Sequence, residues 1–226
     1  MKFAVVTGAS RGIGRAVALA LGARGLDLVA VSRTQAGLDE TAAWLHVGGR
    51  RAMTVSCDVG SAVEVQRLAE QVAAWGAPDV IVHCAGVIRR AHIEEMTEAD
   101  WDVTLDTNLK GVFLVTRAFL PGMKARRSGR IVVVGSISST LGTARASAYC
   151  ASKWGVVGFT KALAEEVRKT GIMVSGILPG SVDTDMLKGS GFSPEMTPEE
   201  VSRAIVFLAL DAPDSMNGSV VEMFGR

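Results

Sequence analysis

Tyr149 and Lys153 lie four residues apart in the run SAYCASK, at the start of a segment whose apolar residues recur at helical spacing as far as residue 167. On a helix, residues i and i+4 share a face, so backbone geometry alone would hold a phenol beside an ammonium group. A free tyrosine has a pKa of about 10 and is a poor acid–base catalyst at neutral pH. A neighbouring cation favours the phenolate, so we expect Lys153 to lower the pKa of Tyr149 and the pair to transfer protons.

Ser136 is the candidate hydroxyl partner of this pair. It follows an apolar run at residues 130–134, which is typical of a buried strand, and it precedes Tyr149 by thirteen residues. A hydroxyl at the carboxyl end of a strand can point into the ligand cleft of an open α/β sheet. Ser138 and Ser139 are rival hydroxyls, and the separation from Tyr149 favours Ser136.

A glycine-rich turn is the second candidate site. Residues 3–6 predict a buried strand, residues 15–24 predict a helix, and TGASRGIG joins them at residues 7–14. Such a turn aims free backbone N–H groups at a pyrophosphate. We expect Gly8 to permit the tight turn, Gly12 to admit the phosphates and Gly14 to allow close helix packing. Glycines can simply mark a loop, but this position after the first strand favours a phosphate site. Its candidate contacts are Gly8, Ser10, Arg11, Gly12, Ile13 and Gly14.

The turn has the spacing G-x-x-x-G-x-G rather than the dinucleotide fingerprint G-x-G-x-x-G. Together with Asn108, Ser136 and the Tyr149/Lys153 pair, it resembles the motif set of the short-chain dehydrogenase/reductase family over essentially the whole chain. The resemblance implies an α/β fold with a single Rossmann domain at residues 1–226, built on a doubly wound, seven-stranded parallel sheet with helices on both faces. It also implies a nicotinamide cofactor, hydride transfer to or from a carbonyl or alcohol, and an Asn108 that bends its helix and holds a water behind Lys153.

Ser32 and Arg33 follow the second predicted strand, residues 26–31, and bear on the choice of cofactor. NAD-selective sites place a carboxylate here for the ribose 2′-hydroxyl, whereas a 2′-phosphate needs a cation. Positions 32–34 hold no acidic residue. We therefore predict that Arg33, with Arg11 of the glycine turn, clamps the 2′-phosphate, which favours NADP(H) over NAD(H). The alternative is that both arginines are solvated surface residues.

The resemblance implies further cofactor contacts. Asp58 would bind the adenine, with Val59 beside it, although Asp58 could also act as a turn residue before a helix at residues 61–75. Ala85 and Gly86 would face the ribose, but this chain has HCAG where the family usually has Asn-Asn-Ala-Gly. Because Cys84 lacks an amide, we expect His83 or water to compensate. The remaining implied contacts are Tyr149, Lys153, Pro179, Gly180, Val182 and Thr184.

The composition disfavours several other functions. The 226 residues are 48% hydrophobic and carry a net charge of +1, so no overall field recruits nucleic acid or a membrane surface. Apolar runs stay well short of the roughly 18 residues of a membrane helix, and we expect a cytoplasmic protein. The three cysteines contain no C-x-x-C pair and the three histidines lack ligand spacing, so we expect no metal site.

The sequence therefore predicts an NADP(H)-dependent oxidoreductase acting on a small carbonyl or secondary alcohol, with Tyr149 as general acid/base, Ser136 holding the oxygen and Asn108 anchoring a water relay. A 3-oxoacyl-carrier-protein reductase or a general ketone/aldehyde reductase is the nearest specific prediction. A short lid at about residues 185–197 would set the substrate. The apolar helix at residues 112–123 indicates that a partner subunit covers it, and the resemblance implies a homodimer or homotetramer. The alternative is a non-catalytic NADP(H)-binding sensor that acts through a partner protein, but such a sensor has no need of Tyr149.

Overall fold

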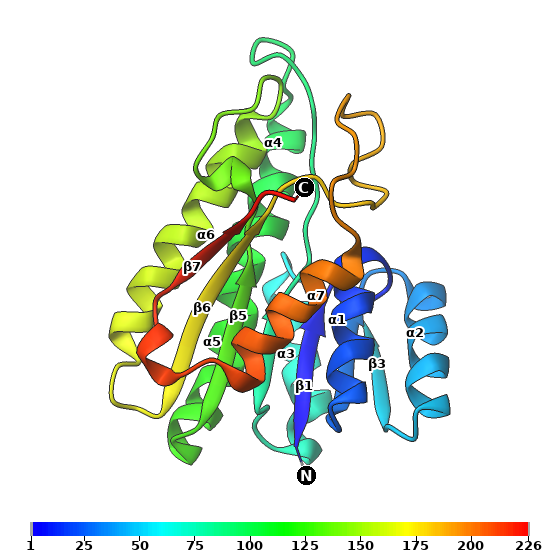
Figure 1. The fold of residues 1–226 in the computed structure, drawn as a ribbon, viewed down its shortest axis with the longest axis vertical. Coiled ribbons are helices and arrows are strands. Elements are labelled where there is room, and N and C mark those ends of the chain that lie inside the picture. Colours follow the sequence, from blue (N-terminus) through cyan, green and yellow to red (C-terminus); the bar gives the residue numbers. More distant parts are fainter. Residues whose placement is uncertain (1, 226) are drawn as a thin grey trace.

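The computed structural model describes residues 2–225, and this part of the chain forms one seven-stranded sheet between two layers of helices (Figure 1). The strand order is β3-β2-β1-β4-β5-β6-β7, and all neighbouring strands are parallel. The strands are β1 Phe3–Thr7, β2 Asp27–Ser32, β3 Ala52–Ser56, β4 Val80–His83, β5 Gly129–Val134, β6 Ile172–Pro179 and β7 Val220–Met223. The predicted doubly wound α/β fold is confirmed.

The helices are α1 Gly12–Ala23, α2 Gln35–Val47, α3 Ala62–Val72, α4 Glu98–Leu105, α5 Gly111–Arg126, α6 Ser147–Glu166 and α7 Pro198–Val206. Helices α1, α2 and α7 cover one face of the sheet, and α3, α5 and α6 cover the other (Figure 1). Successive strand residues serve opposite layers, so Val6 packs into the first core and Val5 into the second. Burial on both faces explains why the strands read as continuous apolar runs.

Two helices continue through π-helical turns that the sequence pattern did not predict. Asp106–Lys110 joins α4 directly to α5, and Phe207–Asp211 extends α7. At the start of α7, Thr197 and Glu200 form a capping box, with the Thr197 hydroxyl accepting from the Glu200 N–H at 3.2 Å and the Glu200 carboxylate accepting from the Thr197 N–H at 2.8 Å. These turns matter because the first of them carries Asn108.

The strand order reverses direction between β1 and β4, which pair side by side in the middle of the sheet. In open α/β sheets the loops diverge at this point and leave a crevice outside the carboxyl ends of the strands. The glycine turn after β1 and the HCAG segment at the end of β4 both lie there. Among residues 2–225, no helix is long and apolar enough to cross a membrane.

Candidate active site

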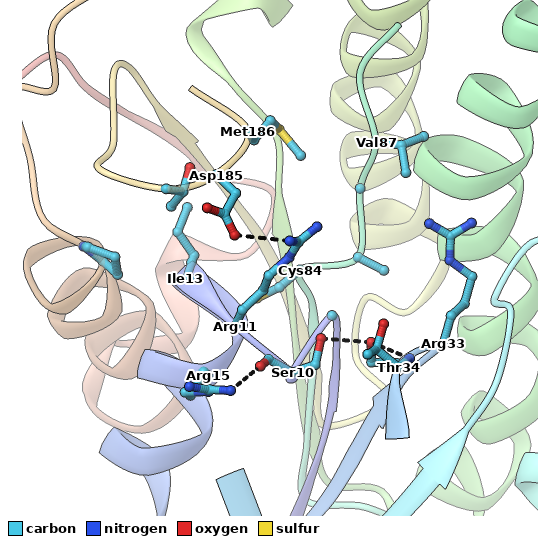
Figure 2. Close-up of a pocket in the computed structure, with 18 of the residues that line it drawn as sticks. Ser10, Arg11, Ile13, Arg15, Arg33, Thr34, Cys84, Val87, Asp185 and Met186 are labelled. Carbon is cyan, nitrogen blue, oxygen red and sulfur yellow. Dashed lines mark hydrogen bonds and ion pairs between the residues drawn. The ribbon is translucent and has the colours of Figure 1, made fainter. Parts of the chain in front are cut away.

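A cleft of about 770 Å³ opens at this reversal point (Figure 2). It extends from the glycine turn past the ends of β2, β3 and β4 to the segment after β6. The predicted cofactor contacts that line it are Gly8, Ser10, Arg11, Gly12, Ile13, Gly14, Ser32, Arg33, Asp58, Val59, Ala85, Gly86 and Thr184. Tyr149, Lys153, Pro179, Gly180 and Val182 are not among its lining residues.

The glycine turn leaves no space for side chains at two positions. Gly8 has a φ of +69°, and a Cβ there would lie 2.8 Å from the backbone nitrogen of Ala85. A Cβ on Gly14 would overlap the carbonyl oxygen of Gly8, so the first turn of α1 packs directly on the loop. Close packing at Gly8 and Gly14 therefore fixes the shape of the turn, which lines the cleft together with the side chains of Ser10, Arg11 and Ile13.

Two hydroxyls and a guanidinium brace the next part of the cleft. The Ser32 hydroxyl donates to the Ser10 hydroxyl at 2.8 Å, which ties the end of β2 to the glycine turn. Arg15 donates to the carbonyl oxygens of Ser10 and Gly37 and pairs with Glu40 at 2.7 Å. Arg15 was not predicted as a site residue, although its position directly after the glycine turn, in the first turn of α1, indicates that it lies close to the cleft.

The two arginines expected to clamp a 2′-phosphate behave differently. Arg33 is exposed at the end of β2 and, within residues 2–225, has no carboxylate at ion-pair distance. Arg11 instead pairs with Asp185 at 2.9 Å, on the segment that follows β6 (Figure 2). Asp185 thus gives Arg11 a partner that the sequence did not predict, and the binding of both guanidiniums to one 2′-phosphate stays a prediction.

Asp58 acts as the turn residue considered for it, and its predicted contact with the adenine stays a prediction. One of its carboxylate oxygens accepts the Gly60 N–H at 2.9 Å and so closes the turn before α3, while the residue also lines the cleft. The helix itself is capped by Ser61, whose hydroxyl accepts from the Glu64 N–H at 3.4 Å.

Tyr149 and Lys153 lie on the buried face of α6, one turn apart. They are 8% and 5% exposed, and the Lys153 Nζ lies 5.6 Å from the centroid of the Tyr149 ring. The same Nζ donates to the Val134 carbonyl oxygen at 2.9 Å, where β5 ends. A Cβ placed on Gly86 would lie 3.8 Å from it, so the ammonium borders the cleft at the HCAG segment.

Burial dominates the acid–base behaviour of this pair. It raises the pKa of Tyr149 above its usual value, and the hydrogen bond from Ser136 and the Arg90 guanidinium only partly oppose the shift. Burial also lowers the pKa of Lys153 to about 8. The expected lowering of the Tyr149 pKa by Lys153 is therefore wrong for the protein without cofactor, because desolvation of the phenolate outweighs the nearby charges.

Ser136 is the hydroxyl that acts on Tyr149. It stands in extended conformation before the short helix Ile137–Ser139 and accepts from the Ser138 N–H at 3.1 Å. The rival Ser138 bonds the Thr143 hydroxyl at 3.2 Å, and Ser139 is buried with no partner for its hydroxyl. Only Ser136 of the three contributes to the pKa of Tyr149.

Asn108 lies on the π-helical turn between α4 and α5, 1% exposed. Its side-chain oxygen accepts from the Val87 N–H at 2.8 Å, and its amide donates to the Val87 carbonyl at 2.9 Å and to the Ser152 hydroxyl at 3.0 Å. The side chain thus fastens the segment after β4 to α6, which carries Tyr149. Both amide hydrogens are used in this way.

His83 does not compensate for the missing asparagine of the HCAG segment, and compensation by water stays a prediction. His83 bonds the Thr116 hydroxyl at 3.0 Å, and burial lowers its pKa to about 3, so it is a neutral core residue. The Ala85 N–H instead donates to the Thr7 hydroxyl at 3.2 Å. Cys84 lines the cleft beside them, and burial raises the pKa of its thiol to about 12. The expectation for His83 was wrong because Thr116 of α5 is its partner.

Several cleft residues carried no signal that the sequence analysis used. These are Thr34, Arg89, Arg90 and Asp183, while Asp185 and Met186 of the predicted lid also line the cleft. The arginine pair that follows HCAG after two apolar residues was the clearest available signal, because charged residues beyond the carboxyl end of a buried strand can face the crevice. Across residues 2–225, no group of three His, Cys, Asp or Glu side chains could hold a metal ion.

Known proteins resemble this chain in sequence over nearly its whole length. The family model described as short chain dehydrogenase matches residues 2–192. Among curated proteins, the chain is 33% identical to a 3-oxoacyl-[acyl-carrier-protein] reductase of Salmonella typhimurium, covering 99% of this chain and 96% of that protein. It is 39% identical to a D-threitol dehydrogenase of Mycolicibacterium smegmatis, covering 96% and 89%.

A solved structure shares the fold closely. It is a candidate NAD(P)-dependent gluconate 5-dehydrogenase from Beutenbergia cavernae, crystallised with NADP bound at low occupancy. The two structures have a TM-score of 0.92 at 36% identity, covering 99% of this chain and 95% of the other.

Proposed function

Since the chain belongs to the short chain dehydrogenase family, we propose that it is an NADP(H)-dependent oxidoreductase that moves a hydride between the nicotinamide and a carbonyl or secondary alcohol carbon. One observation carries the proposal. Ser136 hydrogen-bonds Tyr149, and the neighbour of Tyr149 on α6, Lys153, lies beside Gly86 at the border of a cleft whose other end is the glycine turn. This places a proton donor at one end of a site that suits a dinucleotide.

The residues of the cleft fit NADP(H). Gly8 and Gly14 let the turn pack closely against the end of β4 and the start of α1, and the turn lines the cleft at the N-terminus of this helix, which suits a pyrophosphate. Arg33, without a carboxylate partner in the described chain, is free to bind the 2′-phosphate. The related structure that holds NADP supports the same choice. When bound, the cofactor supplies or accepts the hydride.

Tyr149 delivers the proton. Because its pKa is raised, the phenol holds its proton at neutral pH and is suited to donate it to a carbonyl oxygen during reduction. The Ser136 hydroxyl holds that oxygen, and the Lys153 ammonium, fixed by the Val134 carbonyl, stabilises the negative charge left on the phenol. Asn108 positions Val87 and α6 relative to each other and anchors a water relay.

The substrate is a small carbonyl or alcohol, with 3-oxoacyl thioesters, ketones and aldehydes first among the candidates. The names of the relatives, a 3-oxoacyl-carrier-protein reductase and a D-threitol dehydrogenase, support this range. The chain forms a single domain. Residues 185–197 act as a lid over its cleft, because Met186 lies near Gly86 in the cleft lining. The cytoplasmic location stays a prediction.

A homodimer or homotetramer forms through α5 and α6. Phe113 of α5 is 41% exposed and Trp154 of α6 is 54% exposed, although large aromatic side chains gain most from burial. A second copy of the chain would cover them.

The test is the oxidation of NADPH, followed by absorbance, with a panel of ketones, aldehydes, oxoacyl thioesters and, in reverse, gluconate and threitol. We expect turnover with at least one of them, and a loss of about 100- to 10,000-fold in kcat for Tyr149→Phe with NADPH affinity unchanged. Ser139→Ala is the matched control, because this buried hydroxyl has no partner.

Two results would count against the proposal. Turnover retained by Tyr149→Phe would remove the phenol from proton transfer, since Tyr149 is the sole tyrosine of the chain. Tight NADPH binding without turnover of any substrate would favour the alternative, a cofactor sensor that acts through a partner protein.

A further inference from the structure

The cleft contains several cationic side chains, and most of them are paired with a carboxylate. The ion pairs are Arg11 and Lys188 with Asp185, Arg15 with Glu40, and Arg89 with Asp100 at 3.1 Å. Two cleft arginines, Arg33 and Arg90, have no carboxylate at ion-pair distance anywhere in residues 2–225. These two guanidiniums are therefore the ones available to bind an anion from outside the chain.

The two lie at different parts of the cleft. Arg33 follows β2, beside the Ser10 and Ser32 hydroxyls (Figure 2). Arg90 follows the HCAG segment, donates weakly to the Met186 carbonyl at 3.5 Å, and is close enough to Tyr149 for its charge to favour the phenolate. Arg90 thus belongs to the reacting end of the site, beneath the segment that begins the lid.

A half-buried guanidinium without a counter-ion is poorly solvated and gains strongly from an anion. Its planar fork suits carboxylates and phosphates, which it binds with two parallel hydrogen bonds. The phosphates of NADP are accounted for by the glycine turn and Arg33. No anion of the cofactor is left for Arg90, so its ligand must come with the substrate.

We propose that Arg90 binds an anionic group of the substrate, so that the enzyme prefers carbonyl or alcohol substrates that carry a carboxylate or a phosphate. This inference rests on the proposed function and narrows its substrate class. It makes Arg90 a specificity-determining residue at the cleft, distinct from its neighbour Arg89, which Asp100 already neutralises.

The test compares substrates that differ in charge but share the reacting carbonyl. One pair is acetoacetate and methyl acetoacetate, and the other is dihydroxyacetone phosphate and dihydroxyacetone. We expect the wild type to favour the charged member of one pair by roughly 10- to 100-fold in kcat/KM, the range of a charge-assisted hydrogen bond. Which pair responds tells a carboxylate from a phosphate.

Variants of the adjacent residues Arg89 and Arg90 show which arginine is responsible for the preference for charged substrates. Arg90→Gln should abolish the preference by lowering kcat/KM for the charged substrate, with the neutral one changed only a few-fold. Arg90→Lys should restore part of the preference, because it keeps the charge without the fork. Arg89→Gln, the matched control, should keep the wild-type ratio. A purely structural role for Arg90 would affect charged and neutral substrates equally.

Equal use of both members of each pair by the wild type, or an unchanged ratio in Arg90→Gln, would overturn the inference. If no probe turns over, calorimetry of the same four compounds with the enzyme–NADP⁺ complex gives the same comparison, and equal or undetectable binding of charged and neutral members also contradicts it. Failure of the proposed function is seen separately, as an absence of NADPH binding or of all turnover in the wider panel.

Discussion

The two ends of the cleft are built from different parts of the chain. The glycine turn and the start of α1 present backbone, and Gly8 and Gly14 have no room for a Cβ. The other end presents side chains, with Ser136 after β5, Tyr149 and Lys153 on α6 and Asn108 on a π-helical turn.

This difference separates binding from chemistry. At the backbone end, the same contacts that shape the binding surface also hold α1 against β1, so a substitution should damage fold and cofactor affinity together. At the side-chain end, the reacting groups project from elements that are stabilised by other residues. Substitutions there should remove turnover while the fold survives.

The largest effect is expected for Lys153→Met. Turnover should fall by about 100-fold or more, because the ammonium beside Tyr149 is lost. The folded state should be no less stable at pH 7, since burial already disfavours the ammonium, lowering its pKa from 10.5 to about 8. Urea unfolding measures the stability of the variant, and NADPH oxidation measures its turnover.

The difference in stability between the wild type and Lys153→Met should change with pH in a defined direction. Between about pH 8 and 10.5 the unfolded chain binds the Lys153 proton and the folded chain does not, so wild-type stability rises relative to Lys153→Met as pH rises through this window. Because burial raises the pKa of Tyr149, the phenol keeps its proton in the lower part of this window, where the difference between the proteins reports Lys153. A difference between the two proteins that stays constant from pH 7 to pH 10 would show that the lysine is not perturbed by burial.

Gly14→Ala should have the next largest effect, at the backbone end. The added Cβ meets the Gly8 carbonyl oxygen, and we expect a loss of about 3 kcal/mol in the free energy of unfolding, together with loss of NADPH affinity. Gly158→Ala is the matched control, because Gly158 is also helical but has no atom within 4 Å of the new Cβ. It should stabilise the protein by about 0.5–1 kcal/mol. If Gly14→Ala and Gly158→Ala had the same free energy of unfolding, the close packing at the glycine turn would not contribute to stability as proposed.

Arg33→Gln should act on cofactor choice alone. Loss of a charge-assisted contact to the 2′-phosphate should weaken NADPH binding by roughly 10- to 100-fold and leave NADH binding unchanged. Fluorescence titration with each cofactor measures both affinities. A parallel loss of NADH affinity would instead indicate a general structural role for this arginine.

The smallest effect is the titration of Tyr149 itself. As the sole tyrosine, its phenolate can be followed by ultraviolet difference absorbance without a variant. In the cofactor-free protein the phenol should titrate above its ordinary value of 10.0, because burial raises the pKa. A midpoint below that value would show that the nearby cations, not burial, control the group.

Much of this protein could be predicted from short stretches of sequence. The strands are continuous apolar runs, the glycine turn follows the first of them, and four residues of helix bring Tyr149 and Lys153 to one face. These features depend on local geometry, which spacing along the chain reports directly.

The tertiary structure decided what depends on distant neighbours. Arg11, which was expected at a 2′-phosphate, pairs with Asp185, 174 residues away in the sequence. His83, which was expected to compensate for Cys84, bonds Thr116 instead. The direction of the Tyr149 pKa shift follows from burial under several elements, and the readiness of Arg90 to bind an anion follows from which carboxylates lie elsewhere. Desolvation and ion pairing are set by the surroundings in three dimensions, and no spacing within one segment encodes them.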